Sequence, residues 1–295
     1  MKTRSLKIIN VVGARPNFMK IAPIVKAMKD VETINSILLH TGQHYDNSMS
    51  KAFFTDLDIP EPDIHLNVGS GSHGKQTANI MTKFEEVVVK EKPDMVLLVG
   101  DVNSTLACSI VAAKLQVSIV HVEAGLRSLD WSMPEEINRI ITDSLSDFLF
   151  TTSKDADENL KKEGISEGKI HFVGNVMIDT LLQHREKAKK SEIRNTLGLN
   201  DKPYAVLTLH RPSNVDNKES LSSIFKALEE VVKYINIVFP VHLRTKENIK
   251  KSGLGKVADS IKNLILTEPM GYLDFLNLVT NAKFVLTDSG GLQEE

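Results

Sequence analysis

The sequence predicts an α/β protein with two doubly wound domains, one after the other along the chain. Short apolar runs alternate with amphipathic helical stretches almost throughout the 295 residues, which is the pattern of parallel strands joined by covering helices. One long polar stretch, residues 177–197, interrupts this alternation, and a new apolar strand begins at Tyr204. We interpret the polar stretch as one helix that links the domains, and we expect the domains to span residues 1–180 and 181–295.

The first half of the chain contains six apolar runs that predict strands. They cover residues 7–12, 34–39, 95–99, 117–122, 148–151 and 170–173. An amphipathic helix should follow the turn at Gly13, because apolar residues recur there at helical spacing. These residues are Ile21, Ile24, Val25 and Met28. Further helices are predicted at residues 76–90 and 103–116. Another helix should begin after a cap at Asp46, and one more should end near Gly164. Residues 58–75 have the composition of a loop.

The second half repeats the alternation of strand and helix. Strands are predicted from Tyr204 to Leu209 and at residues 235–239, 264–266 and 284–286, with helices at residues 220–234 and 272–280. The last of these strands is followed by Ser289-Gly290-Gly291, which predicts a turn and the beginning of another helix.

Charge and composition exclude several classes of partner. With 36 basic and 38 acidic residues the net charge is −2, so there is no electrostatic reason to expect nucleic-acid or membrane binding. No apolar run approaches the roughly 18 to 20 residues of a membrane span, and the N-terminus lacks a signal-peptide pattern. Cys108 is the only cysteine, so we expect a cytoplasmic protein without disulfides. The nine histidines show no ligand spacing, so no metal is expected.

The stretch His121–Arg139 contains many ionisable residues between two apolar elements. Glu123 follows the apolar run 117–122, and Pro134 is expected to begin a helix with Glu135 and Glu136 in its first turn. A solvated loop with an ordinary helix cap would explain this composition. A ligand site explains it better, because open α/β sheets bind ligands at the carboxyl ends of their strands.

Polar residues follow directly on most of the predicted strands. These residues are Arg15, Gln43, Asp101, Glu123, His210 and Ser289. Two doubly wound domains facing each other would direct all of these strand ends into one cleft, although polar loops without a shared function remain the alternative. We expect acid–base chemistry there, from Asp101, Glu123, Glu135 and His210, since no Gly-x-Ser-x-Gly nucleophile motif is present.

The turn at Ser289-Gly290-Gly291 is a candidate phosphate site, because small residues at a helix start let backbone N–H groups approach an anion. A tight turn without a ligand is an equally good explanation. Arg15 and Arg211, each next to a proline, could add positive charge. No turn matches G-x-G-x-x-G or a P-loop, so nicotinamide chemistry and ATP hydrolysis are disfavoured and no cofactor is expected.

An ordered set of motifs covers essentially the whole chain. The set comprises Gly13-Ala-Arg-Pro with Lys20 and Pro23, Thr41-Gly-Gln-His44, Gly100-Asp101, His121 to Ser128, Pro134-Glu-Glu-Ile-Asn-Arg139, Gly174-Asn175, Leu209-His-Arg211, Pro240-Val-His242 and Thr287 to Glu295. In this order they resemble the UDP-N-acetylglucosamine 2-epimerases of the non-hydrolysing type.

The resemblance implies a GT-B-type fold, in which two Rossmann-like domains hold a UDP-sugar in the cleft between them. It also implies epimerisation at C2 by elimination of UDP to 2-acetamidoglucal and re-addition, without a cofactor, and commonly a homodimer. By motif, the catalytic residues would be Asp101, Glu123, Glu135 and His210. The substrate-binding residues would be Arg15, Lys20, Arg139, Arg211, Ser289, Gly290 and Gly291, with Glu295 at the ribose.

Three features of this sequence differ from the family pattern. Gly13-Ala-Arg-Pro-Asn17 replaces the usual Gly-Thr-Arg-Pro-Glu. Gln43, His44 and His242 are candidates for a regulatory second site, although Tyr45-Asp46-Asn47 departs from the family. The family also continues beyond the helix that follows Ser289, so we expect a C-terminally truncated chain with an incomplete second domain.

Four other functions remain open. The chain could be a hydrolysing 2-epimerase that releases N-acetylmannosamine and UDP, or an epimerase of another UDP-2-acetamido sugar. It could also bind a UDP-sugar without turnover. A GT-B glycosyltransferase is less well supported, because four acid–base groups exceed what sugar transfer requires.

Overall fold

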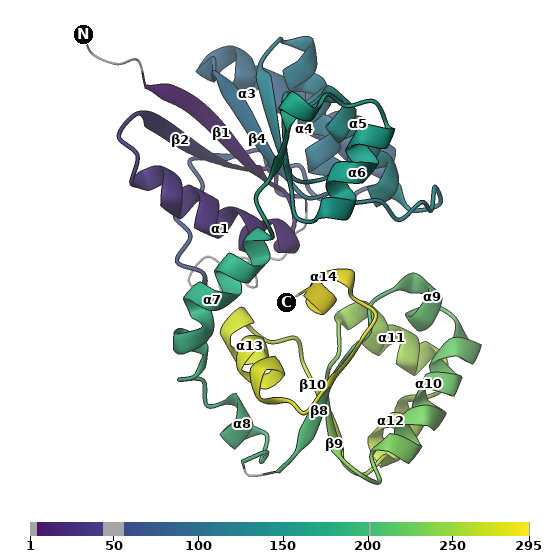
Figure 1. Ribbon diagram of the computed structural model, residues 1–295. Coiled ribbons are helices and arrows are strands. Elements are labelled where there is room, and N and C mark those ends of the chain that lie inside the picture. Colours follow the sequence, from purple (N-terminus) through teal and green to yellow (C-terminus); the bar gives the residue numbers. More distant parts are fainter. Residues whose placement is uncertain (1–4, 44–55, 201, 295) are drawn as a thin grey trace. The chain divides into compact units, whose positions relative to one another are not determined.

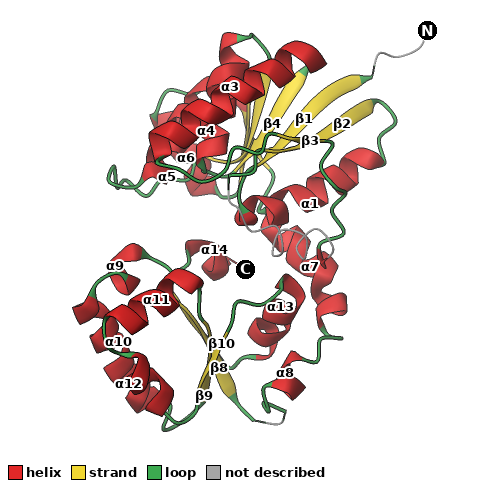
Figure 2. Ribbon diagram, turned by 180° about the vertical axis from the view of Figure 1, so that it is seen from behind, coloured by secondary structure: helices red, strands yellow, loops and turns green. Residues whose placement is uncertain are grey.

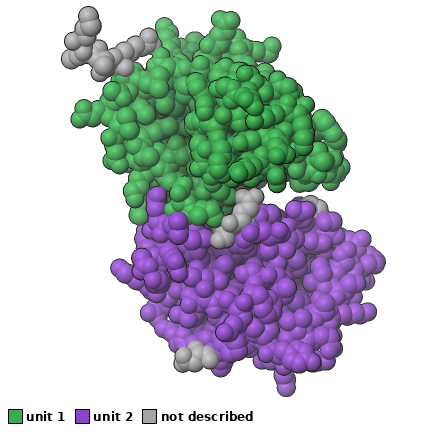
Figure 3. Space-filling view, viewed as in Figure 1, with its two compact units in different colours: residues 1–180 green, residues 181–295 purple. Residues whose placement is uncertain are grey.

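The computed structural model of the protein describes residues 5–43, 56–200 and 202–294, and at residues 15, 16, 212 and 294 it describes the backbone alone. The chain forms two compact units, Met1–Thr180 and Leu181–Glu295 (Figure 3). Each unit has its own parallel sheet, which confirms the predicted α/β fold class. No helix within the described ranges combines the length and apolar character that a membrane crossing requires.

The first unit is built on a sheet of seven strands in the order β3-β2-β1-β4-β5-β6-β7. All neighbouring pairs are parallel. The strands are β1 (Leu6–Val12), β2 (Ile34–His40), β3 (Ile64–His65), β4 (Met95–Val99), β5 (Ser118–Ala124), β6 (Phe148–Thr151) and β7 (Ile170–Phe172).

Helices cover both faces of this sheet (Figures 1 and 2). One face is covered by α1 (Arg15–Lys29), and the other by α3 (His73–Glu91), α4 (Asn103–Lys114), α5 (Pro134–Leu145) and α6 (Lys154–Lys162). Right-handed crossovers produce this division, because the chain moves from β1 to β2 and β3 and then returns across the sheet to β4. The carboxyl ends of β1 and β4 therefore form the topological switch point, where doubly wound sheets bind ligands.

The second unit has a sheet of four parallel strands in the order β10-β9-β8-β11. They are β8 (Tyr204–Thr208), β9 (Asn236–Pro240), β10 (Leu264–Thr267) and β11 (Val285–Thr287). Alternate residues of β8 enter two different cores. Ala205 and Leu207 pack with Phe225 and its neighbours on one face, while Tyr204 and Val206 pack with Leu278 on the other. Burial on both faces explains why the strand is mostly apolar.

The helices of the second unit are mostly short. Those that follow β8 are α9 (Pro212–Val215), α10 (Lys218–Val231), α11 (Leu243–Lys251), α12 (Gly255–Ser260), α13 (Tyr272–Asn281) and α14 (Gly290–Glu294). Of these, α9, α11 and α12 are absent from the sequence-based prediction. Helix α11 has only two buried residues, Thr245 and Ile249, so its apolar face is too sparse to produce a clear helical period.

The predicted single helix at residues 177–197 is wrong. The chain forms α7 (Val176–Ala188) and the short α8 (Ile193–Thr196), with a break between them. Hydrogen bonds from side chains stabilise the chain at this break. Asn277 donates to the Ala188 carbonyl at 2.8 Å. Ser191 donates to Asp274 and accepts from the Ile193 amide. These partners lie far away in sequence, so local helical periodicity could not reveal the break.

The predicted loop at residues 58–75 is also partly wrong, and one prediction lies outside the described residues. The segment contains β3, and α3 begins at His73 because the Ser72 hydroxyl caps it by accepting from the Lys75 amide. The expected helix cap at Asp46 falls within residues 44–55, which the structure does not describe.

Candidate active site

The side chain of Asn17 connects the two strand ends that form the switch point of the first unit. Its Oδ1 atom accepts from the amides of Gly13 and Ala14 at 3.3 and 3.0 Å, and its Nδ2 atom donates to the Val99 carbonyl at 2.8 Å. The turn after β1 is thereby attached to the end of β4. A Cβ atom on Gly13 would lie 2.3 Å from the Ser104 hydroxyl, so this turn requires glycine.

Glu123 occupies a strained position near the end of β5. The strand does not end before Glu123, as the sequence suggested, but continues to Ala124. The pairing with β6 shifts between Val122 and Ala124, so Glu123 is the extra residue of a β-bulge, with φ of 70°. A non-glycine residue at positive φ stores strain, and bulges of this kind redirect a side chain.

The redirected carboxylate of Glu123 forms an ion pair with Lys20 of α1. Both side chains are largely buried, with 16% and 8% of their areas exposed. Lys20 thus neutralises Glu123, and its predicted role in substrate binding stays a prediction.

Asp101 follows β4 and is held by a second cation, Arg139 of α5. The NH1 atom of Arg139 lies 2.5 Å from Oδ2 of Asp101, and its NH2 atom lies 2.6 Å from Oε2 of Glu136. Asn138 donates to the Asp101 carbonyl at 2.8 Å. One turn of α5 therefore orients both the backbone and the side chain of Asp101.

Glu135 and Glu136 are neighbours on α5 with different environments. Glu136 is buried, and its carboxylate accepts from the amides of Ser128 and Leu129 at 3.0 and 2.9 Å. Although burial opposes ionisation, these bonds and Arg139 lower the pKa of Glu136 to about 2. Glu135 is half-buried and makes no hydrogen bond or ion pair with any described residue. Glu136 thus holds the loop before α5.

In the second unit, His210 and Asp288 come together from neighbouring strands. His210 follows β8 and Asp288 follows β11, and the distance from His210 Nδ1 to Asp288 Oδ1 is 2.8 Å. Asp288 also accepts from the amides of His210 and Arg211 and from Asn214 Nδ2. Burial opposes its ionisation, but these donors lower the pKa of Asp288.

The candidate phosphate turn lies beside this pair. Arg211 is exposed, and its Nε atom donates to the Asp288 carbonyl at 2.8 Å. The Ser289 hydroxyl accepts from the Leu292 amide at 3.4 Å, within the first turn of α14. No described atom lies within 4 Å of a Cβ atom placed on Gly290, so packing inside the unit does not require glycine there.

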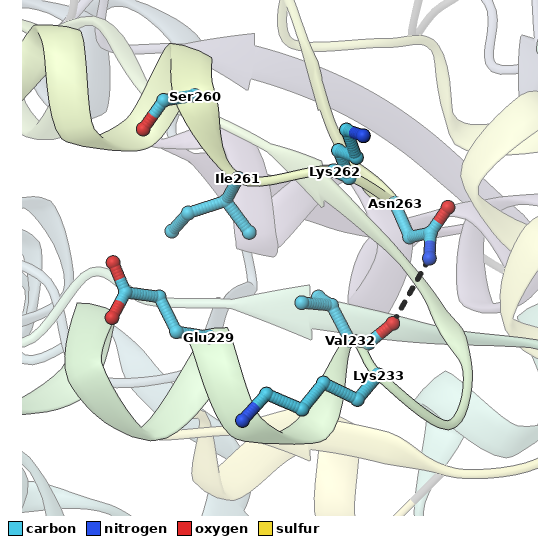
Figure 4. A pocket seen from close by; sticks show the side chains of 7 residues that line it. All are labelled: Glu229, Val232, Lys233, Ser260, Ile261, Lys262 and Asn263. Carbon is cyan, nitrogen blue, oxygen red and sulfur yellow. Dashed lines mark hydrogen bonds between the residues drawn. The ribbon is translucent and has the colours of Figure 1, made fainter.

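A surface hollow of the second unit lies at the opposite end of its sheet (Figure 4). It is bordered by the end of α10 and by the residues that lead into β10. Its lining includes Glu229, Lys233 and Asn263. Ligands of doubly wound sheets bind at the carboxyl ends of the strands, so this hollow is separate from the candidate site.

The remaining predicted site residues have varied positions. The Gln43 side chain is buried and accepts from the Ser104 hydroxyl at 2.8 Å, while His242 is exposed and caps α11. The side chain of Arg15 and the residues His44 and Glu295 lie outside the described part. Asn17 and Asp288 were not among the predicted site residues, although both belong to the motifs noted above. Within the described ranges, no group of three or more His, Cys, Asp or Glu side chains could hold a metal ion.

The fold and these groups together define a two-unit α/β enzyme with acid–base side chains at the carboxyl ends of parallel strands. The chain belongs to the UDP-N-acetylglucosamine 2-epimerase family, because the model of that family matches residues 26–295. The predicted family and enzyme class are therefore confirmed.

Individual relatives agree with this assignment. A UDP-N-acetylglucosamine 2-epimerase homolog of Methanococcus maripaludis is 48% identical over 292 residues, which are 98% of this chain and 80% of the relative. A UDP-2,3-diacetamido-2,3-dideoxy-D-glucuronate 2-epimerase of Pseudomonas aeruginosa is 43% identical, again over 98% of this chain and 80% of the relative. The crystal structure of Methanocaldococcus jannaschii UDP-GlcNAc 2-epimerase in complex with UDP-GlcNAc and UDP superimposes with a TM-score of 0.90 at 44% identity. That match covers 98% of this chain and 80% of the other.

Proposed function

We propose that this protein epimerises C2 of a UDP-2-acetamido sugar, interconverting UDP-GlcNAc and UDP-ManNAc. The observation that carries the proposal is the placement of Asp101 and Glu123. They leave the neighbouring strands β4 and β5 at the same edge of the sheet, where Val99 pairs with Val122. Each carboxylate has one cationic partner, Arg139 or Lys20. Two carboxylates at one edge suit a reaction that removes a proton and returns one.

The proposed reaction proceeds by elimination and re-addition. A carboxylate removes the C2 proton, the C1–O bond to UDP breaks, and a C1–C2 double bond forms. A second acid then protonates C2 on the opposite face while UDP adds again to C1. Asp101, Glu123 and Glu135 are the proposed groups for the C2 protons. No redox step occurs, so the atoms balance without a cofactor.

His210 is the proposed group that serves the departing diphosphate. Asp288 holds its Nδ1 atom, so the other ring nitrogen, Nε2, belongs to the exposed part of the side chain. A histidine oriented by a carboxylate in this way has a defined tautomer, which suits proton transfer to or from an oxygen.

The remaining motif residues are proposed to bind the nucleotide. Arg15, Lys20, Arg139 and Arg211 would position the diphosphate or the sugar, the turn Ser289–Gly291 would bind phosphate, and Glu295 would bind the ribose hydroxyls. Replacement of Arg15 by alanine should weaken UDP binding by roughly 1.5 to 3 kcal/mol, the scale of a charge-assisted hydrogen bond. Isothermal titration calorimetry with UDP measures this difference, and unchanged affinity would remove Arg15 from the site.

Incubation with UDP-GlcNAc in D2O, followed by NMR, tests the reaction. Formation of UDP-ManNAc with deuterium at C2 is the expected result. Epimerised product without deuterium would contradict the elimination route, while free N-acetylmannosamine and UDP would identify a hydrolysing enzyme. Binding without any product would leave a UDP-sugar-binding protein.

The relative from Pseudomonas aeruginosa motivates a second substrate in the same experiment, because its name gives a UDP-2,3-diacetamido uronate. A higher kcat/KM for that sugar than for UDP-GlcNAc would move the proposed specificity to it. We further propose a cytoplasmic homodimer, which light scattering on the purified protein and fractionation of cells would test.

A further inference from the structure

The side chain of His121 is fully buried in β5 and has a partner at each ring nitrogen. Its Nδ1 atom lies 2.6 Å from Oδ1 of Asp143 on α5, and its Nε2 atom lies 2.8 Å from the Gly100 carbonyl oxygen. His121 is not among the proposed catalytic groups, and two polar contacts of this length inside a core need an explanation.

The two partners define the charge of the ring. The Gly100 carbonyl can only accept a hydrogen bond. Asp143 uses its second oxygen to accept from the Gly125 amide at 3.0 Å and pairs there with Arg127 at 2.7 Å. A neutral imidazole has one N–H and cannot donate to both partners, whereas an imidazolium can. With Asp143 ionised, both contacts therefore require His121 as a cation.

Electrostatics in the core agree with this assignment. Burial by itself would lower the pKa of His121, but Asp143, the Gly100 carbonyl and the more distant Glu123 together raise it above its ordinary value. Burial would likewise raise the pKa of Asp143, but His121 and Arg127 lower it. Arg127 in turn forms a two-pronged contact with Glu163, at 2.7 and 2.6 Å.

The His121–Asp143 pair is hydrogen-bonded to the backbone near each candidate carboxylate, before Asp101 and after Glu123. Gly100, with φ of 67°, immediately precedes Asp101. Glu123, with its strained φ, lies between His121 and Gly125, and Asp143 holds the Gly125 amide. Gly125 packs closely against α6, so this position requires glycine: a Cβ atom there would lie 2.5 Å from the Ala156 carbonyl oxygen.

We propose that the buried His121–Asp143 pair is a positioning element, which fixes the backbone at Asp101 and Glu123 so that the two carboxylates keep one relative geometry. The bond to Gly100 sets the end of β4, and Asp143 sets the end of β5 through Gly125. This inference rests on the proposed function of Asp101 and Glu123. It assigns to His121 and Asp143 an effect on the rate of the chemical step, with no contact to the substrate.

Two substitutions separate the two halves of the pair. In His121→Asn the amide nitrogen takes the place of Nδ1 and keeps the bond to Asp143, whereas in His121→Gln it takes the place of Nε2 and keeps the bond to Gly100. Each variant should lower kcat by about 10- to 100-fold, the scale of a small misplacement of a catalytic group. KM for UDP-GlcNAc should change much less, because the substrate does not touch the pair.

Ile80→Ala is the matched control for lost stability. Ile80 is fully buried on α3, in the core of the same unit, and it belongs to neither strand end. The substitution should lower the melting temperature of the protein, because it leaves a cavity in the core, and should leave kcat nearly unchanged well below that temperature. A kcat loss in Ile80→Ala equal to that of the His121 variants would overturn the positioning role, as would a normal kcat in both His121 variants.

Nitrogen-15 NMR of the histidine rings in the unsubstituted protein provides a test that does not depend on the folding of a variant. The His121 ring should carry a proton on both nitrogens at pH 8, where an ordinary histidine is neutral. A neutral His121 ring at that pH would overturn the proposal, because it could not donate to both partners.

Asp101→Asn and Glu123→Gln distinguish failure of the inference from failure of the proposed function. If both lose activity while the His121 variants retain it, only the positioning role fails. If either keeps a normal kcat, the proposed function of that carboxylate fails and the inference that depends on it fails too.

Discussion

The Nδ1 atom of His210 lies 2.8 Å from Oδ1 of Asp288, so an exposed histidine is oriented by a buried carboxylate. The contact exists because β8 and β11 are neighbours, with Thr208 opposite Thr287. Asp288 also accepts hydrogen bonds from the amides of His210 and Arg211, so it fixes both the turn after β8 and the His210 ring. The arrangement directs the Nδ1–H bond toward Asp288 and leaves Nε2 for proton transfer.

Asp288→Asn should therefore lower kcat by about 10²-fold, since acid–base groups contribute on that scale and the ring would lose its orientation. Steady-state kinetics of epimerisation measures this effect. The same substitution in a His210→Ala background should have little further effect, because Asp288 acts through the histidine.

Asn214→Ala is the control for this prediction. Asn214 also donates to Asp288, at 3.0 Å, but it does not touch the His210 ring in any contact of the described structure. Its kcat should stay within about threefold of the unsubstituted protein, below the scale of a lost acid–base group. Additive losses from Asp288→Asn and His210→Ala would show that the two residues act separately.

The adjacent residues Glu135 and Glu136 provide a matched pair of substitutions. Glu135→Gln should lower kcat by about 10² or more with an unchanged melting temperature, because Glu135 has no partner among the described residues. Glu136→Gln should destabilise the protein by about 1 to 3 kcal/mol, because the neutral amide is a poorer acceptor for the Ser128 and Leu129 amides.

Kinetics and thermal unfolding of the two variants give the comparison. A normal kcat in Glu135→Gln would remove that residue from the proposed catalytic set. An unchanged melting temperature in Glu136→Gln would show that its contacts to the loop contribute little to stability.

Short apolar runs were sufficient to predict every strand of the two sheets except β3. Strands that are buried on both faces are mostly apolar, as β4 and β8 are, and such runs are easily recognised. Helix boundaries that depend on distant partners were not predictable. The break after Ala188 depends on Asn277, and no local feature of residues 177–197 indicates it.

Individual site residues were easier to select from the sequence than their contacts. Lys20 and Glu123 belong to α1 and β5, and only the strand order β1-β4-β5 brings them near each other. The positive φ of Glu123 could not be predicted from the sequence either, because the usual sequence signal for that conformation is glycine. Asp288 was overlooked beside Ser289 because its partner His210 lies on a different strand.

The depressed pKa of Glu136 leads to a prediction about stability and pH. Its folded pKa of about 2 lies below the ordinary value of 4.5, so the ionised carboxylate stabilises the folded state above pH 4.5. This stabilisation should decline as pH falls from about 4.5 toward 2, because the unfolded chain binds a proton at Glu136 in this range while the folded protein does not. Urea unfolding at pH 7, 5 and 3 measures the decline.

Glu136→Gln isolates the contribution of this residue from that of other acidic groups. The free energy of unfolding of the two proteins should differ most at pH 7 and converge as the pH approaches 3. A constant difference across this range would mean that Glu136 has the same pKa in the folded and the unfolded protein.

The strained backbone at Glu123 predicts an unusual order of stability for two substitutions. At an ordinary strand position alanine is more stable than glycine by roughly 0.5 to 1 kcal/mol, because glycine is more flexible in the unfolded chain. Glu123 has φ of 70°, a conformation that glycine adopts readily and alanine does not. Glu123→Gly should therefore be at least as stable as Glu123→Ala.

Both variants lose the carboxylate, so both leave Lys20 without its partner, and the difference between them reports the backbone alone. Both should also be inactive, because the proposed catalytic group is gone. Val120 of the same strand is the control position, since it pairs regularly with Leu97 and Phe148 and lies outside the bulge. There the alanine variant should be the more stable one. If alanine were more stable than glycine at both positions, the bulge at Glu123 would store no appreciable strain.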